Sequence, residues 1–542
     1  MLGTVVVALY TGLLGVLSVL ALHRLSLALA HRGYCGRIDR LVSGSLRFVA
    51  SPSVGPPSVG PPSVLVQLPL YNESCVAQRV IDAACSLEYP ADRLHVQVLD
   101  DSNDGSEAQV AAVVRRWAAC GVNVMHLWRP RREGFKAGAL AAGLRMSSAD
   151  LVAMFDADFV PPRDFLQRLI PAFQDPRVGM VQARWGHLNR HDALLTEAQG
   201  ALLDAHFVHE HGGRFARGLF FNFNGTCGIW RRAAILDAGG WSSRTLTEDL
   251  DLSYRAQLLG WRFVYRPDVV VPGELPAGVR AFKAQQYRWA KGSIETARWL
   301  LPKIWGARLS MRQRVEATVH LGGNMAYPLV LLLALLVPFA HMTDNAIISP
   351  VVALLDALLL LLSTVALLAF YGLALHRSGA PRRSLMFLPV AMSLGAALAI
   401  NNTRAVFSAF AGRRESFVRT PKVGTSGPKD VGLRPAGSGH GVFSRGLSFE
   451  VSGCGVQPWV ELSMGLYMVM AALSLLREGR AAALPFVFLW VGGFLWFGLG
   501  TLARSSGGEV CGRGGTCKNV DSTKVDDENL YGNGGRCSAS SG

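Results

Sequence analysis

Hydrophobic residues follow two different patterns along the chain. An uncharged apolar run of about the length of a membrane span occurs at residues 5–22, and further apolar runs occur after residue 300. Between residues 64 and 300, short apolar segments alternate with amphipathic ones. That alternation is typical of an α/β domain with a mostly parallel sheet. The pattern therefore predicts a soluble α/β domain placed between membrane segments.

Four apolar segments of the central region have the length and composition of strands. They are residues 64–70, 94–100, 122–128 and 151–157. The first, second and fourth end in polar residues. Ligands of open α/β sheets bind at the carboxyl ends of the strands, so this edge is where we expect a site.

The first apolar run predicts a membrane anchor, because it is too long for most signal-peptide cores and no basic segment precedes it. Arginines follow it, and the positive-inside rule then puts the next region in the cytosol. After residue 300, further runs predict about four to five membrane helices. They are 326–339, 347–373, 385–400, 459–473 and 482–502. Basic loops flank residues 385–400 on both sides, so we expect this segment to be re-entrant or interfacial, with a complete span as the alternative.

The predicted organisation has five parts. An N-terminal anchor occupies residues 1–30, and a basic, Pro-rich linker with an SVGPP repeat occupies residues 31–63. The α/β domain occupies residues 64–300, and the membrane region occupies residues 301–504, with a cytosolic loop at 402–455. A Gly- and Ser-rich tail at 505–542 is expected to be disordered.

Composition excludes two broad classes. The chain has 542 residues, of which 50% are hydrophobic and 17% are charged. A disordered chain would be poorer in apolar residues, and a soluble domain would be richer in charge. The net charge of +15 suits cytosolic loops of a membrane protein better than a nucleic-acid partner. The nine cysteines form no CxxC pair, so we expect reduced thiols rather than a zinc site.

Two clusters of acidic residues follow predicted strands. Asp100 and Asp101 end the strand at 94–100, where the simpler interpretation is a helix cap or a solvated turn. Asp156 lies near the end of the strand predicted at 151–157, and Asp158 follows it directly. On an extended chain they would lie on the same side, where two carboxylates can hold a divalent ion on a diphosphate.

Two more motifs come later in the domain. Thr247-Glu248-Asp249 begins a predicted helix, either as an N-terminal cap or as a carboxylate placed as a general base. Gln285-Gln286-Tyr287-Arg288-Trp289 lies on a basic helix just before the membrane region, where an Arg-Trp pair could also be an interfacial anchor.

The order and spacing of these motifs resemble the processive family 2 glycosyltransferases of the cellulose-synthase-like group, and most closely the mannan and glucomannan synthases. The resemblance covers nearly all of residues 64–300 and includes LPLYNE, DDSND, REGFKAGAL, FDADF, VQARWGHLN, FNFNGTCGIWR, GGWSSRTLTEDLDLSYRA, GELP and QQYRWAKG. A looser match, FVRTPK at 417–422, looks like the gating loop of cellulose synthases.

The resemblance implies a GT-A fold, a Rossmann-like domain that binds a nucleotide sugar, together with α-helical transmembrane segments. It implies a membrane-bound inverting glycosyltransferase that polymerises β-1,4-mannan or glucan from GDP-mannose or UDP-glucose and translocates the chain. One alternative is the transfer of a single sugar to a lipid. Another, from a different class, is a transporter or a non-enzymatic scaffold, although the ionisable residues cluster outside the spans.

The resemblance also implies a role for each matching residue. The catalytic set is Asp249 as base, Glu248 and Asp100; the nucleotide-binding set is Tyr71, Glu73, Asp101, Lys136 and Arg288. Asp156 and Asp158 would bind Mg²⁺ or Mn²⁺. Gln285, Trp289, Asn224 and Thr226 would bind the acceptor, and Phe417, Arg419, Thr420 and Lys422 would belong to the gating loop.

The expected partners are the nucleotide sugar, the growing polysaccharide and membrane lipids, with no nucleic acid. The richness in Ala, Gly and Arg favours a bacterial plasma membrane, with the Golgi as the eukaryotic alternative and the catalytic domain on the cytosolic side.

Overall fold

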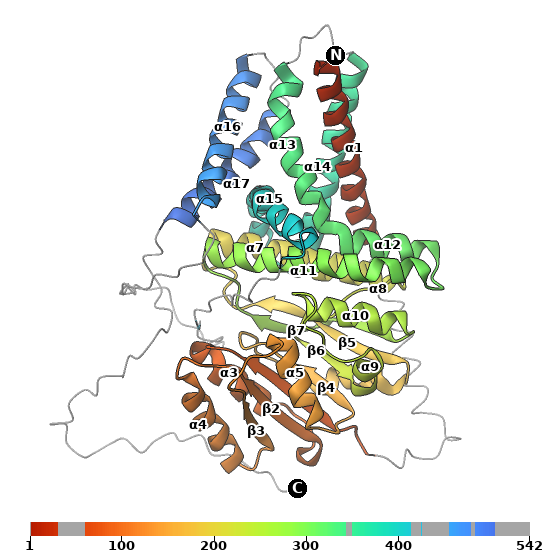
Figure 1. Ribbon diagram of the computed structural model, residues 1–542, viewed down its shortest axis with the longest axis vertical. Helices are drawn as coiled ribbons and strands as arrows, with labels where there is room; N and C mark the ends of the chain where they lie inside the picture. The colour runs from red at the N-terminus through yellow and green to blue at the C-terminus, as the bar shows by residue number, and fades with distance from the viewer. Residues whose placement is uncertain are drawn as a thin grey trace, which may run out of the picture.

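The computed structural model describes residues 2–30, 60–342, 350–413, 424, 455–477 and 483–503. Figure 1 shows three layers: a helical bundle, helices that lie across its foot, and an α/β domain beneath them. Residues 31–59 of the predicted linker, the predicted tail and all four gating-loop residues lie outside the described residues.

The α/β domain is built on a seven-stranded sheet with the order β3-β2-β1-β4-β6-β5-β7. Its strands are β1 Val64–Leu70, β2 Leu94–Asp100, β3 Val124–Trp128, β4 Leu151–Met154, β5 Val178–His187, β6 Gly228–Arg231 and β7 Arg262–Gly273. All pairs are parallel except those of β6, which runs antiparallel to both neighbours. The mostly parallel sheet expected from the sequence is therefore confirmed. The strand predicted at 151–157 was too long, because β4 ends at Met154.

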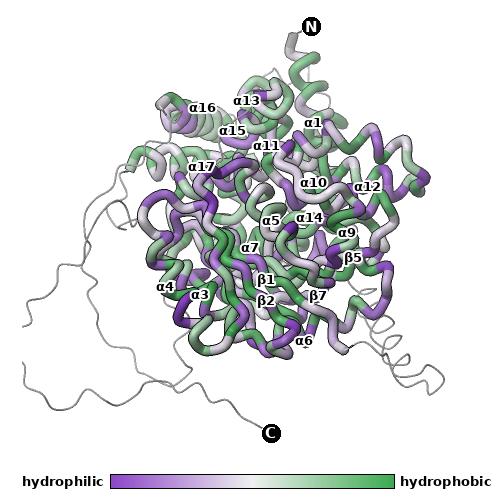
Figure 2. The backbone as a smooth tube through the Cα atoms, turned by 60° about the horizontal axis from the view of Figure 1, so that its bottom comes forward, coloured by the Kyte–Doolittle hydropathy of each residue, from purple (hydrophilic) through white to green (hydrophobic). Residues whose placement is uncertain are grey.

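Hydrophobic strands and close-packed helices form the core of this domain. β1 and β2 consist mostly of hydrophobic residues (Figure 2) and are buried almost throughout. At Gly143 of α5, a Cβ would come within 2.6 Å of side-chain atoms of Gln67 and Gln97, so the helix rests directly on β1 and β2. The helices of the domain are α3 Ser74–Cys85, α4 Ser106–Ala119, α5 Phe135–Arg145, α6 Phe165–Leu169, α9 Arg232–Asp237 and α10 Glu248–Leu258.

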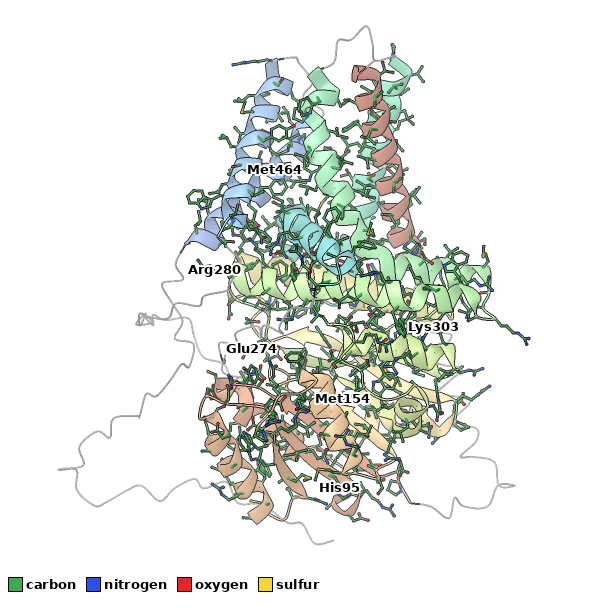
Figure 3. All side chains as sticks on the ribbon, viewed as in Figure 1. His95, Met154, Glu274, Arg280, Lys303 and Met464 are labelled. Atoms are coloured by element: carbon green, nitrogen blue, oxygen red, sulfur yellow. The ribbon has the colours of Figure 1, made fainter. Side chains whose placement is uncertain are left out.

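A layer of helices separates the sheet from the bundle. It contains α7 Leu194–Ala205, the π-helix η3 His206–His211, α8 Gly212–Ala216, α11 Val279–Gly306 and α12 Met311–Gly322. The long helix α11 runs across the molecule, with Arg280 near one end and Lys303 near the other (Figure 3). It therefore presents one flank to the α/β domain and the other to the bundle.

The bundle contains α1 Leu2–Leu29, α13 Ala326–Met342, α14 Pro350–Arg377, α15 Leu388–Phe410, α16 Gln457–Arg477 and α17 Leu484–Leu502. Among the described residues, six helical stretches are long and apolar enough to cross a membrane, one near the N-terminus and five after residue 300. Their positions agree with the predicted anchor and the predicted later helices. Residues 402–410 were wrongly assigned to a loop, because α15 continues to Phe410.

Helix α15 contains the segment whose relation to the membrane the sequence left open. It packs against α11 and α17 and stays near the foot of the bundle in Figure 1. Its length and hydropathy would also allow a crossing. The interfacial or re-entrant placement stays a prediction.

Candidate active site

A pocket lies at the carboxyl edge of the sheet, between the strand ends and α11. Residues after β1, β2, β4 and β7 line it, together with the start of α10 and one flank of α11. Twelve of the fourteen candidate residues within the described part of the chain line this pocket: Tyr71, Glu73, Asp101, Lys136, Asp156, Asp158, Asn224, Glu248, Asp249, Gln285, Arg288 and Trp289. Residues more than 200 positions apart in the sequence are thus brought together.

One end of the pocket is an aromatic and charged wall at the ends of β1 and β2. Arg129 binds Asp101 with two hydrogen bonds, Nε to Oδ1 and Nη2 to Oδ2, both 2.7 Å. The guanidinium of Arg132 lies 3.5 Å from the centre of the Tyr71 ring. Burial lowers the pKa of Arg132, although Tyr71 and Asp101 partly offset the effect. The wall offers an aromatic face and charged groups, which suit a nucleobase and a ribose.

Lys136 lies in the first turn of α5, after a backbone that bends sharply. Gly134 has φ 69°, and a Cβ on Gly138 would lie 1.9 Å from the Glu133 carbonyl oxygen. The Lys136 ammonium donates to Asp156 Oδ1 at 2.5 Å and to the Gly225 carbonyl at 2.8 Å. Burial alone would lower the pKa of Lys136, but Asp156 and Glu248 outweigh it and raise the pKa. The lysine is therefore a fixed cation at the pocket floor.

Asp156 and Asp158 lie in a turn after β4, not on an extended strand as the sequence analysis assumed. The Phe159 amide donates to the Asp156 carbonyl at 3.1 Å, which closes the turn. Thr226 is fully buried and its Oγ1 accepts from the Asp156 amide at 2.8 Å. The expected acceptor role of Thr226 is therefore wrong; the residue holds the turn. Both carboxylates still line the pocket, but the turn places them there, not the alternation of side chains along an extended strand.

The two carboxylates fit a divalent cation that a diphosphate helps to bind. Among the described residues, no three His, Cys, Asp or Glu side chains form a complete metal cage. Mg²⁺ sites that act on phosphates commonly use one or two carboxylates, with substrate oxygens and water as the other ligands. Asp156 and Asp158 supply that donor chemistry, and Lys136 balances the charge of Asp156.

Glu248 and Asp249 begin α10 at the pocket floor. Burial and the neighbouring Glu248 carboxylate raise the pKa of Asp249 to about 7. Burial also raises the pKa of Glu248, against the opposing effect of Lys136. A Cβ on Gly225 would lie 3.0 Å from Asp249 Oδ2, so the backbone of residue 225 closely approaches this carboxylate. A carboxylate with a pKa near 7 has the property that a general base needs.

The α11 flank supplies Gln285, Arg288 and Trp289, as their helical spacing predicts. Burial lowers the pKa of Arg288 to about 10, while Glu248 and Asp156 favour its charged form. The Trp289 ring lies 6.4 Å from that of Trp185, which lies 5.0 Å from Phe159. These rings form an aromatic wall beside the arginine, of the kind on which a sugar can stack.

Close packing of α11 against the start of α10 keeps the Arg288-Trp289 flank beside the Glu248-Asp249 carboxylates. A Cβ on Gly292 would lie 2.5 Å from Thr247 Cγ2 and 2.8 Å from the Thr247 amide nitrogen. We expect Gly292→Ala to push the helices apart and to destabilise the protein by about 1–3 kcal/mol. Gly306→Ala is the matched control, because no atom lies within 4 Å of its Cβ position. Thermal unfolding of both variants checks this; an equal melting temperature for the two would contradict it.

Asp100 does not line the pocket, and its assignment to the catalytic set was wrong. Its side chain is fully buried and accepts from the Ser102 amide at 2.9 Å and contacts His126 Nε2 at 2.9 Å. These hydrogen bonds outweigh burial and lower its pKa. Asp100 therefore shapes the turn that presents Asp101.

The sequence analysis missed several pocket residues. Arg132, Trp185, His187 and Glu274 line the pocket, and Arg129 holds Asp101. All of these residues except Arg129 lie within the sequence segments that resemble the family, and those segments could therefore have identified them as pocket residues. Gly424, the described residue nearest the gating motif, donates to Glu274 Oε2 at 3.3 Å.

Residues 61–292 match the family described as "Glycosyltransferase like family 2". Glucomannan 4-beta-mannosyltransferase 2 of Arabidopsis thaliana is 47% identical over 246 residues, covering 44% of this chain and 46% of that protein. Glucomannan 4-beta-mannosyltransferase 1 of Oryza sativa subsp. japonica is 45% identical over 246 residues, covering 44% and 47%. This chain spans about half the length of the curated relatives it matches.

A solved mannosyltransferase from Pyrobaculum calidifontis, in complex with GDP-Man and Mn²⁺, is similar at 24% identity. The similarity covers 71% of this chain and 99% of that one, with a TM-score of 0.40. The family match confirms the resemblance expected from the sequence. Together with the seven-stranded mixed sheet, it also confirms the GT-A fold.

Proposed function

We propose that the protein is an inverting β-mannosyltransferase. Residues 61–292 match the family 2 glycosyltransferases and have the GT-A fold, which supports this proposal. The protein would extend a β-1,4-linked mannan chain from GDP-mannose. The observation that carries the proposal is the pocket itself, where a carboxylate with a pKa of about 7, a paired acidic turn and an Arg-Trp helix face one another. The names of the relatives favour mannose over glucose.

The donor would lie along the strand ends. Tyr71, Glu73 and Asp101 would hold the nucleoside, with Arg129 keeping the Asp101 carboxylate in place. Lys136 and Arg288 would bind the diphosphate, where the planar fork of the arginine suits paired oxygens. A Mg²⁺ or Mn²⁺ ion held by Asp156 and Asp158 would neutralise charge on the departing nucleoside diphosphate.

The transfer would be a single displacement at the anomeric carbon. Asp249 would remove the proton of the acceptor hydroxyl as its oxygen bonds to that carbon, and the bond to the diphosphate would break. A donor with an α-linked sugar would then yield a β linkage. Glu248 would assist by holding the pKa of Asp249 up, so that the carboxylate is basic enough for the proton.

The acceptor would lie beside the aromatic wall formed by Trp289, Trp185 and Phe159. Trp289 offers a ring face for the terminal sugar, and Gln285, on the same face of α11, offers an amide for a hydroxyl. Asn224 precedes Gly225, which approaches Asp249, so its amide would lie near the attacking hydroxyl.

The membrane helices would let the growing polymer leave as it lengthens, since a polysaccharide cannot cross hydrocarbon unaided. In this arrangement the catalytic domain faces the cytosol. The runner-up is transfer of one sugar to a lipid at the same site. Membranes containing the protein and labelled GDP-mannose separate the two: we expect label in high-mass polymer. Label confined to an organic-soluble product would contradict the synthase proposal.

The pKa of Asp249 predicts a pH dependence. Its folded value lies above its usual range, so below pH 7 the carboxyl is protonated and cannot accept a proton. We therefore expect kcat/KM to rise with pH through about 7 and to level off above it. Glu248→Gln removes the neighbouring carboxylate that helps to raise the pKa of Asp249, so the rise of kcat/KM should move to lower pH. If the rise stayed at the same pH in this variant, the assignment of Asp249 as the general base would be contradicted.

A further inference from the structure

A π-helical segment lies between the pocket and the N-terminal membrane helix. Residues His206–His211 form this segment, η3, at the end of α7. π-Helical turns are rare and often occur at functional sites. Here the wider turn brings the rings of His206 and His211 to a centroid distance of 4.5 Å. The two imidazoles thus form a pair that an α-helix would not produce.

This histidine pair holds the side chain of Asn224. His206 Nε2 lies 3.1 Å from Asn224 Oδ1, and Asn224 Nδ2 lies 2.8 Å from His211 Nε2. His211 is buried, and burial holds its pKa well below the usual range, so it is neutral. His211 Nε2 also lies 2.9 Å from the Asn222 carbonyl oxygen, to which a ring N–H can donate, and His206 contacts the Oδ1 end of Asn224. The two rings therefore fix the position of the Asn224 side chain at the pocket.

On its other side, the pair continues into a chain of charged groups. His206 Nδ1 lies 3.0 Å from Glu210 Oε2, and Glu210 Oε1 lies 3.5 Å from Arg24 Nε on α1. Arg214 contacts Glu210 at 3.7 Å and Glu316 of α12 at 2.9 Å. Burial would raise the pKa of Glu210, but His206, Arg24 and Arg214 hold it well below the usual range. Polar contacts thus run from α1 to the pocket.

We propose that His206 and Glu210 are positioning residues for the sugar acceptor, and that Arg24 makes the N-terminal membrane helix part of this arrangement rather than an anchor alone. The inference rests on the proposed function, because it takes Asn224 as an acceptor contact. Losing Arg24 would leave Glu210 less constrained, and His206 would then hold the Asn224 amide less well. The proposed nucleoside-binding residues Tyr71, Glu73 and Asp101 follow β1 and β2 and are not members of this chain of contacts.

The test uses the full-length protein in membranes and a manno-oligosaccharide primer as the acceptor. Arg24→Gln is the first variant, because it removes the ion pair with Glu210 at a side chain that is 46% exposed. We expect the acceptor KM to rise about fivefold, as for the loss of one net hydrogen bond, while GDP binding stays unchanged. His206→Gln should raise the acceptor KM too, and in the double variant the two effects should not add.

Arg217→Gln is the matched control. Arg217 also joins the catalytic domain to α1, donating to the Ser26 carbonyl at 2.6 Å and to Ser26 Oγ at 3.1 Å, whereas Arg24 and Arg214 are the arginines that contact Glu210. It should leave the acceptor KM unchanged. An unchanged acceptor KM in Arg24→Gln, or an equal rise in Arg217→Gln, would overturn the inference while normal sugar transfer continues. Absence of transfer by the unaltered protein would instead contradict the proposed function.

Discussion

Asp249→Asn should lower kcat by about 10²–10⁴-fold, the usual contribution of a general base. The amide keeps the size of the carboxylate but cannot take the proton of the acceptor hydroxyl. Donor binding should survive, because the substitution removes a negative charge from the floor that receives the diphosphate. Steady-state kinetics with labelled GDP-mannose, together with a separate titration of GDP, measure the two effects.

The control for this variant is Asp237→Asn, an exposed aspartate at the end of α9 and outside the pocket. It should transfer sugar at the normal rate. If Asp249→Asn retained normal kcat at normal expression, another group would have to be the base. If it lost GDP binding as well, Asp249 would belong to the donor site.

Asp156→Ala should abolish the effect of Mg²⁺ or Mn²⁺ on nucleotide binding. The substitution removes the more exposed carboxylate of the acidic turn and leaves Lys136 without its 2.5 Å partner. Since a catalytic metal contributes several kcal/mol, we expect kcat/KM to fall by about 10²–10⁴-fold. Calorimetric titration of GDP with and without Mn²⁺ measures the coupling directly.

The unaltered protein should bind GDP more tightly with Mn²⁺ than without it. Asp164→Asn, at a half-exposed aspartate that precedes α6, is the control and should keep this difference. GDP affinity that responds to Mn²⁺ equally in Asp156→Ala and in the unaltered protein would contradict the metal assignment.

Local sequence patterns predicted the strands well but not the turns after them. β1 and β2 have the predicted bounds, because each is a mostly apolar segment with polar residues at or just after its carboxyl end. The acidic turn at residues 156–158 depends instead on Thr226, which is 70 residues away and supplies the oxygen for the Asp156 amide. No pattern around residue 156 carries that information.

The candidate site was predicted best where the position of a side chain depends only on the helix that carries it. Gln285, Arg288 and Trp289 share one flank of α11, as their spacing requires. Asp100 and Asp101 are neighbours that point to different surroundings, and choosing between them needs the position of β3, which carries His126. The π-turn of η3 was also beyond prediction, since it differs from an α-helix only in its hydrogen bonding.

The most direct test of the account is the chemistry of the product. Membranes with the unaltered protein, supplied with labelled GDP-mannose and Mn²⁺, should form a high-mass polymer that an endo-β-1,4-mannanase degrades, and membranes with Asp249→Asn should not. Polymer that resists this enzyme, or equal labelling with Asp249→Asn, would contradict the proposal that this pocket joins mannose units by β-1,4 linkages.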